Sequence, residues 1–288
     1  MSKLTHLLAC QNITGEGPLW HPNEYKLYWV DILGEKIQRY DPQSFAYEQF
    51  TVGEPISVIG LREKGGFIAA GKQGFAFWDA ESNQVKHITH PEQDKPEARF
   101  NDGKVDHAGR FWAGTMTPQG ATSTLYRLDP DLQVHRMVEG VTISNGIGWS
   151  PDSHTMYYVD TLRYVLYAYD FDLELGKISN RRTLVQLSGE QGVPDGLTVD
   201  AEGCIWCAIW GGWKVIRYSP EGESLEEVQV PVAQPSCCAF GGEKLDTLFI
   251  TTAREGLSAA ELAKQPLAGD LFAFKPGVNG LLEPEFKG

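Results

Sequence analysis

Short apolar runs alternate with polar turns along the whole chain. Runs rich in aromatic and β-branched residues, such as YKLYWVDI and TMYYVDT, are bounded by stretches of Gly, Pro, Asp and Asn. Runs bounded in this way predict β-strands, and the 3.6-residue apolar spacing of amphipathic helices does not occur between them. The pattern therefore predicts an all-β protein.

One sequence pattern, a small residue followed by a polar turn and an apolar run, repeats six times. The units are GPLWHPNEYKLYWVDI from Gly17, GLREKGGFIAAG from Gly60, GKVDHAGRFWAGTM from Gly103, GIGWSPDSHTMYYVDT from Gly146, GLTVDAEGCIWCAIW from Gly196 and AFGGEKLDTLFITT from Ala239. Successive units begin 43 residues apart, apart from one interval of 50 residues. A repeat of this length with about four strands has the size of a propeller blade. We therefore predict that residues 1–288 form a single six-bladed β-propeller with four-stranded antiparallel blades.

The segment from Leu4 to Gln11 precedes the first unit. We predict that it forms the outermost strand of the last blade and so closes the ring. Closure of this kind protects sheet edges that would otherwise pair with other chains.

The position just before each small residue predicts a metal site. In a propeller the innermost strands line the central axis, so equivalent positions form a ring. The six residues at this position are Glu16, Ile59, Asp102, Asn145, Asp195 and Cys238. Asp and Asn are also common in ordinary turns, but three converging carboxylates repel one another unless a cation compensates them. Oxygen ligands suit Ca²⁺, the preferred ion here, and also Mg²⁺ or Mn²⁺, and carboxylates bind Zn²⁺ as well.

Composition excludes several classes of protein. The 38 acidic and 25 basic residues give a formal net charge of −13, and the basic residues are scattered, which argues against nucleic-acid binding. No run of 18 apolar residues occurs, so we expect no membrane span. The five cysteines are an odd number, which favours a reducing cytoplasm over a disulfide framework.

Several segments resemble the regucalcin (senescence marker protein)/gluconolactonase family nearly from end to end. They include GEGPLW, RFNDGKVDHAGRFWAGTM, ISNGIGWS and SCCAFGG. The resemblance implies a six-bladed propeller with one metal ion held by Glu16 of GEGP, Asn145 of SNG and Asp195 of PDG. It also implies that Arg99 and Asn101 of RFND position the substrate, and that Asp195 is the catalytic base.

Two positions lie apart from the family pattern. Animal members carry acidic residues near the place of Thr117-Pro118-Gln119, so Gln119 is expected to be an uncharged substitute for a substrate-binding Glu. Asp102 belongs to the ring position of the repeat, although the resemblance gives it no ligand role. It therefore remains a further candidate for contact with the metal.

The resemblance implies a metal-dependent sugar lactonase. Such an enzyme hydrolyses an aldono- or uronolactone, for example glucono-1,5-lactone, to the open-chain acid, so the expected partner is a small sugar lactone. Two other interpretations fit the same residues: a calcium-binding propeller scaffold without turnover, and a hydrolase of a non-sugar ester such as an organophosphate. The sequence alone does not distinguish a monomer from a dimer or identify the lactone.

Overall fold

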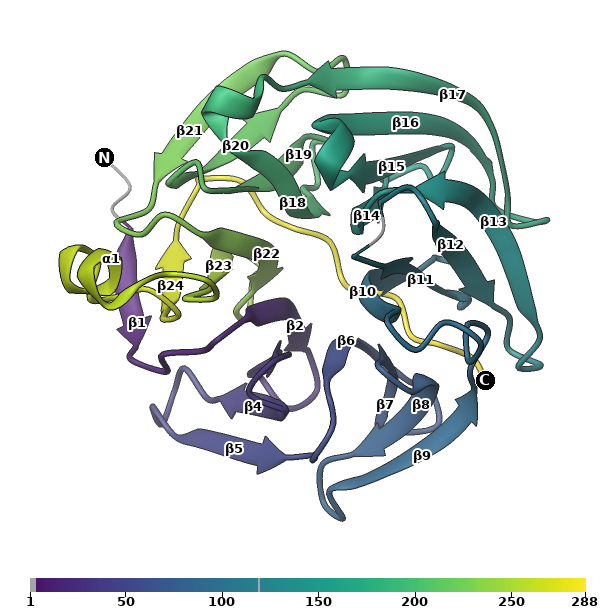
Figure 1. The fold of residues 1–288 in the computed structure, drawn as a ribbon, viewed down its shortest axis with the longest axis horizontal. Helices are drawn as coiled ribbons and strands as arrows, with labels where there is room; N and C mark the ends of the chain where they lie inside the picture. The colour runs from purple at the N-terminus through teal and green to yellow at the C-terminus, as the bar shows by residue number, and fades with distance from the viewer. Residues whose placement is uncertain (1–3, 119) are drawn as a thin grey trace.

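The strands form six four-stranded antiparallel sheets around a central axis (Figure 1) in a computed structural model that describes residues 4–118 and 120–288. In five of the six sheets the chain runs from the innermost to the outermost strand. The first five sheets are β2-β3-β4-β5, β6-β7-β8-β9, β10-β11-β12-β13, β14-β15-β16-β17 and β18-β19-β20-β21. The predicted six-bladed propeller is confirmed.

The strands of the described residues are β1 (Thr5–Leu8), β2 (Gly15–His21), β3 (Lys26–Asp31), β4 (Lys36–Tyr40), β5 (Tyr47–Thr51), β6 (Ile56–Leu61), β7 (Phe67–Gly71), β8 (Gly74–Asp79), β9 (Gln84–Thr89), β10 (Arg99–Val105), β11 (Phe111–Met116), β12 (Ser123–Leu128), β13 (Val134–Val141), β14 (Ser144–Trp149), β15 (Thr155–Asp160), β16 (Val165–Asp172), β17 (Lys177–Gln186), β18 (Val193–Val199), β19 (Ile205–Trp210), β20 (Lys214–Tyr218), β21 (Ser224–Gln229), β22 (Pro235–Gly241), β23 (Thr247–Thr252) and β24 (Leu271–Phe274). Short helices are η1 (Thr161–Arg163), η2 (Gly189–Gln191) and α1 (Ala259–Lys264). No helix in this part of the chain has the length and apolar character needed to cross a bilayer.

The last blade contains both ends of the folded chain. Its order is β22-β23-β24-β1, and β1 pairs antiparallel with β24, for example Thr5 with Ala273. The His6 imidazole also lies 2.8 Å from the Asp270 carboxylate. The prediction that an N-terminal strand closes the last blade is therefore confirmed.

Apolar side chains pack between neighbouring blades rather than around one common centre. Tyr28 of the first blade packs with Phe67 and Trp78 of the second, and Trp112 of the third packs with Trp149 of the fourth. Equivalent clusters fill the other four junctions. Each sheet therefore buries both faces, which explains why many strands are apolar throughout.

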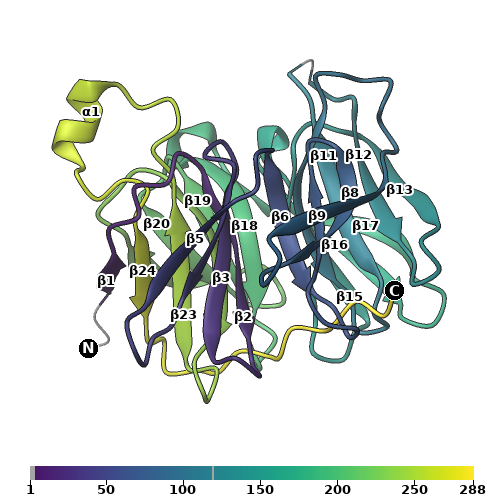
Figure 2. The same ribbon diagram turned by 90° about the horizontal axis from the view of Figure 1, so that it is seen from below.

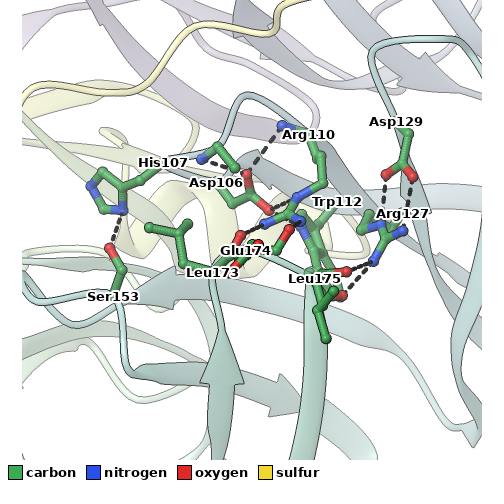
Figure 3. A network of polar contacts seen from close by, with 12 residues as sticks. Asp106, His107, Arg110, Trp112, Arg127, Asp129, Ser153, Leu173, Glu174 and Leu175 are labelled. Atoms are coloured by element: carbon green, nitrogen blue, oxygen red, sulfur yellow. Dashed lines mark hydrogen bonds and ion pairs between the residues drawn. The ribbon is translucent and has the colours of Figure 1, made fainter.

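A turn with the sequence Asp-x-x-Gly-x-x-Trp occurs twice in the chain, where it joins the first two strands of the third and of the fifth blade. The Asp106 carboxylate accepts hydrogen bonds from Arg110 Nε at 2.7 Å and Trp112 Nε1 at 2.8 Å, and Arg110 Nη2 donates to the Leu173 carbonyl of the next blade at 2.7 Å (Figure 3). Asp200 accepts in the same way from Trp206 Nε1 at 2.9 Å. A buried carboxylate held by several donors is costly to disrupt, so this turn ties neighbouring blades together.

The C-terminal segment after β24 runs across one end of the propeller, opposite to α1 (Figure 2). The Phe286 N–H donates to the Leu61 carbonyl at 2.8 Å, and the Phe286 side chain is fully buried. Lys104 of β10 forms a 2.8 Å ion pair with Glu283 of the same segment. This segment covers that end of the axis, and the opposite end stays accessible through the pocket described below.

Candidate metal and substrate site

The innermost strands are irregular where they reach the axis. The register of β14 shifts between Ser144 and Ile147, and that of β18 shifts between Pro194 and Leu197. Asn145 and Asp195 therefore lie in bulges, outside the ladder of paired residues. Bulges redirect side chains next to functional sites.

Glycine follows both residues because the blades approach closely there. A Cβ atom on Gly146 would lie 2.5 Å from the Asp195 carbonyl oxygen, and one on Gly196 would lie 2.3 Å from Cys237 Sγ. No larger residue fits at these two positions without moving the backbone. The recurring glycine of the repeat thus brings the side chains that precede it together at the axis.

The candidate site residues line one pocket of about 340 Å³. This pocket lies at the end of the axis that the C-terminal segment does not cover. Its polar lining is Thr14, Glu16, Arg99, Asn101, Asn145, Thr161, Asp195 and Glu255. Its apolar lining is Ile32, Met116, Ile143, Leu162, Val193 and Trp210. The structure thus brings together five of the residues singled out from the sequence: Glu16, Arg99, Asn101, Asn145 and Asp195.

The Asn145 amide is oriented by a chain of hydrogen bonds. Its Nδ2 donates to Thr161 Oγ1 at 3.1 Å, and Thr161 Oγ1 donates to the Pro194 carbonyl at 3.0 Å. Among the described residues no donor reaches Asn145 Oδ1, although this oxygen is buried. A buried acceptor without a partner is costly, and a cation would satisfy it.

Glu16 and Asp195 are buried carboxylates in the same pocket. Their exposed fractions are 6% and 5%. Burial raises the pKa of both groups well above the usual range; the charge of Asp195 raises that of Glu16 further, and the charge of Asp102 raises both. Bringing these carboxylates together in ionised form therefore needs a positive charge between them.

Two carboxylates and one amide oxygen suit a hard divalent cation such as Ca²⁺. In the described part of the chain, no three His, Cys, Asp or Glu side chains form a metal-binding group. The third protein oxygen here comes instead from Asn145, whose orphaned Oδ1 fits that role. The residues present therefore match the requirements of such an ion.

Arg99 and Asn101 form a connected pair beside these residues. Arg99 Nη1 donates to Asn101 Oδ1 at 2.8 Å and to the Phe100 carbonyl at 2.9 Å, and Asn101 Nδ2 donates to the Ser144 carbonyl at 2.9 Å. In the described structure every hydrogen bond that the Arg99 side chain donates uses Nη1. Its Nε and Nη2 groups are therefore free to bind a ligand.

Asp102 lies near the pocket but does not line it. The register of β10 shifts between Phe100 and Asp102, so that Asn101 is the unpaired residue and Asp102 pairs with Gly114. Because successive residues of a strand point to opposite sides, Asp102 lines a separate cavity of about 30 Å³ together with Lys104 and Glu283. Burial raises the pKa of Asp102 to about 6.

The structure also shows pocket residues that the repeat did not reveal. Gln119, the expected substrate-binding amide, lies outside the described residues. Met116, Thr161, Trp210 and Glu255 line the pocket from the ends of the second strands or the loops that follow them. The second strand of each blade runs back to the end of the axis where the first strand begins. The ends of the second strands could therefore have been predicted from the repeat as further pocket positions.

The fold and the pocket define a six-bladed propeller with an oxygen-rich site at one end of its axis. Residues 14–254 match the family profile described as SMP-30/Gluconolactonase/LRE-like region. The chain belongs to this family.

Curated relatives match along nearly the whole chain. A regucalcin of Oryctolagus cuniculus is 40% identical over 276 residues, which cover 93% of this chain and 92% of the relative. A 6-deoxy-6-sulfogluconolactonase of Pseudomonas putida is 41% identical over 280 residues, which cover 96% of both chains.

Solved structures share the fold. A luciferin-regenerating enzyme superimposes with a TM-score of 0.94 at 29% identity and covers 100% of both chains. A calcium-binding protein, regucalcin, from Agrobacterium tumefaciens superimposes with a TM-score of 0.93 at 28% identity, covering 98% of this chain and 96% of that one.

Proposed function

We propose that this protein is a metal-dependent sugar lactonase that hydrolyses an aldono- or uronolactone to the open-chain acid. The observation that carries the proposal is the pocket itself. It combines two buried carboxylates and an orphaned amide oxygen with an arginine that has free donors. The names of relatives support the substrate class, since one is a sulfogluconolactonase.

Glu16, Asn145 and Asp195 would hold the ion, and Ca²⁺ is the first candidate because one structural relative is named a calcium-binding protein. When bound, a divalent ion supplies Lewis-acid stabilisation of the developing oxyanion. Mg²⁺, Mn²⁺ and Zn²⁺ remain alternatives for the same oxygen ligands.

The protein side chains would divide the remaining tasks. Asp195 would accept the proton of the attacking water, because its buried carboxylate lines the pocket where the lactone would bind. Arg99 and Asn101 would donate hydrogen bonds to sugar hydroxyls and orient the ring. The apolar wall, which includes Ile143 and Trp210, would exclude water around the lactone and strengthen these polar contacts.

A substrate panel tests this proposal. Purified protein with added Ca²⁺ is offered gluconic, galactonic and arabinonic lactones, an aryl ester and an organophosphate, and acid release is followed in a pH-stat. We expect turnover of sugar lactones well above the spontaneous rate and little turnover of the other two compounds. Turnover of the organophosphate alone would support a non-sugar hydrolase, and Ca²⁺ binding without any turnover would support a scaffold.

A further inference from the structure

Glu255 is a carboxylate of the pocket that the proposed mechanism does not use. It follows β23 in the last blade and lies outside the repeating ring position. Its Oε2 accepts a hydrogen bond from Thr14 Oγ1 at 2.8 Å, and its backbone carbonyl accepts one from Gln234 Nε2 at 3.1 Å. Side chain and backbone are therefore both held in place. Within residues 4–118 and 120–288, no hydrogen bond or ion pair involves the second oxygen, Oε1.

Arg99 and Glu255 line the same pocket. Among the described residues that line this pocket, Arg99 is the only one with a cationic side chain. No ion pair within 4.0 Å joins Arg99 and Glu255 in this part of the chain, although both side chains line the pocket. Burial lowers the pKa of Arg99, and Glu255 opposes this shift more strongly than Glu16 or Asp195 does. Glu255 is thus the carboxylate that compensates Arg99 most.

We propose that Glu255 determines substrate specificity, by accepting a hydrogen bond from a sugar hydroxyl while it compensates the charge of Arg99 in the same pocket. The inference rests on the proposed lactonase function. A hydroxyl group donates and accepts, so it bridges a carboxylate and a guanidinium. A carboxylate or sulfonate only accepts, and Glu255 repels it. The pocket therefore selects neutral lactones over lactones with an anionic substituent.

The charges of the pocket agree with this selection. Glu255 and Arg99 compensate each other, and Glu16 and Asp195 together match the charge of one divalent cation. A neutral lactone would then leave no uncompensated charge in the filled pocket. An anionic lactone would add a negative charge that no group of the pocket compensates, and a buried charge without a partner is costly.

The test compares D-glucono-1,4-lactone with D-glucaro-1,4-lactone, which differ in having a hydroxymethyl or a carboxylate group at carbon 6. In Glu255→Gln we expect kcat/KM for the neutral lactone to fall about tenfold, mainly through KM. We expect the preference for the neutral over the anionic lactone to shrink by at least tenfold, because the side chain at position 255 then no longer repels the carboxylate, and the free donors of Arg99 can bind it. Glu255→Asp keeps the charge and should keep the preference.

Glu243→Gln is the matched control, since it removes the same charge in the exposed turn between β22 and β23. It should leave both rates unchanged. An unchanged preference in Glu255→Gln, with a melting temperature like that of the wild type, would overturn the proposal. So would an equal shift in Glu243→Gln, because the effect would then come from net charge alone.

Binding separates this inference from the proposed function. Calorimetry with D-gluconolactam, a neutral analogue that resists hydrolysis, measures binding to the Ca²⁺-loaded protein without turnover. We expect Glu255→Gln to weaken binding about tenfold and Glu243→Gln to leave it unchanged. If no variant hydrolyses a lactone, the lactonase proposal fails while this binding difference still supports the role of Glu255. Equal lactam affinity in Glu255→Gln and wild type contradicts that role.

Discussion

Thr161 offers a direct way to test how the site is organised. Its hydroxyl links Asn145 Nδ2 to the Pro194 carbonyl, at 3.1 and 3.0 Å, and so turns Asn145 Oδ1 toward the place where an ion would be held. Thr161→Val keeps the shape of the side chain and removes both hydrogen bonds. Each such bond contributes about 0.5–1.5 kcal/mol.

If Thr161→Val loses one or two of these hydrogen-bond energies from the Ca²⁺-bound state, we expect the Ca²⁺ affinity to fall about tenfold. A free-energy change of about 1.4 kcal/mol corresponds to a factor of ten in affinity. This agrees with the effect of removing residues that orient metal ligands elsewhere. Isothermal titration of the chelated protein with Ca²⁺ measures the change, and the melting temperature checks that the variant is folded.

Thr14→Val is a stringent control for Thr161→Val. Thr14 lines the same pocket, but its hydroxyl donates to Glu255 and not to a proposed metal ligand. We expect its Ca²⁺ affinity to stay within about twofold of the wild-type value, a change of under 0.5 kcal/mol. Wild-type affinity in Thr161→Val would contradict this role of Thr161, because Asn145 would then need no orienting partner or would not bind the ion.

Three further predictions follow from the buried carboxylates. Asp195→Asn should keep the fold by circular dichroism but lower kcat by about 10²–10⁴-fold, and wild-type turnover would exclude Asp195 as the base. Ca²⁺ at about 100 times its Kd should raise the free energy of unfolding by about 2.7 kcal/mol, and an unchanged melting temperature would contradict a native-state site. Burial raises the pKa of Asp102 to about 6, above that of an unfolded Asp, so ionised Asp102 destabilises the folded, chelated protein. Its free energy of unfolding should therefore fall by up to about 3 kcal/mol as the pH rises from 4 to 7, and denaturant titrations of Asp102→Asn should lack this part of the decrease.

The sequence predicted the architecture well because each blade repeats the same packing problem. The regular spacing of the repeat units predicts the innermost strands, and the ring position includes Glu16, Asn145 and Asp195, which all line the pocket. Asp102 shares that ring position but faces another cavity, since the bulge of β10 falls one residue earlier than a strict repeat implies. A local shift of this kind leaves no trace in the spacing of the units.

Other features depend on contacts between segments far apart in the sequence. Glu255 lies in a loop of the last blade and accepts a hydrogen bond from Thr14, which precedes the first blade. The two residues meet because the closed ring brings the two ends of the chain together. Phe286 lies beyond the last repeat and is buried against the second blade. Phe286 has no counterpart in the other units, and Glu255 takes its hydrogen bond from a residue near the opposite end of the chain, so the repeat could not indicate either contact.

The metal dependence of lactone hydrolysis is measured by titrating the chelated protein with Ca²⁺ while the hydrolysis of glucono-1,5-lactone is followed in a pH-stat. We expect a rate near the spontaneous one without the ion and a rise that saturates at one Ca²⁺ per chain. The same experiment on Asp195→Asn should show almost no rise. A chelated protein as active as the Ca²⁺-loaded one, or full Ca²⁺ occupancy without hydrolysis, would contradict a metal-dependent lactonase.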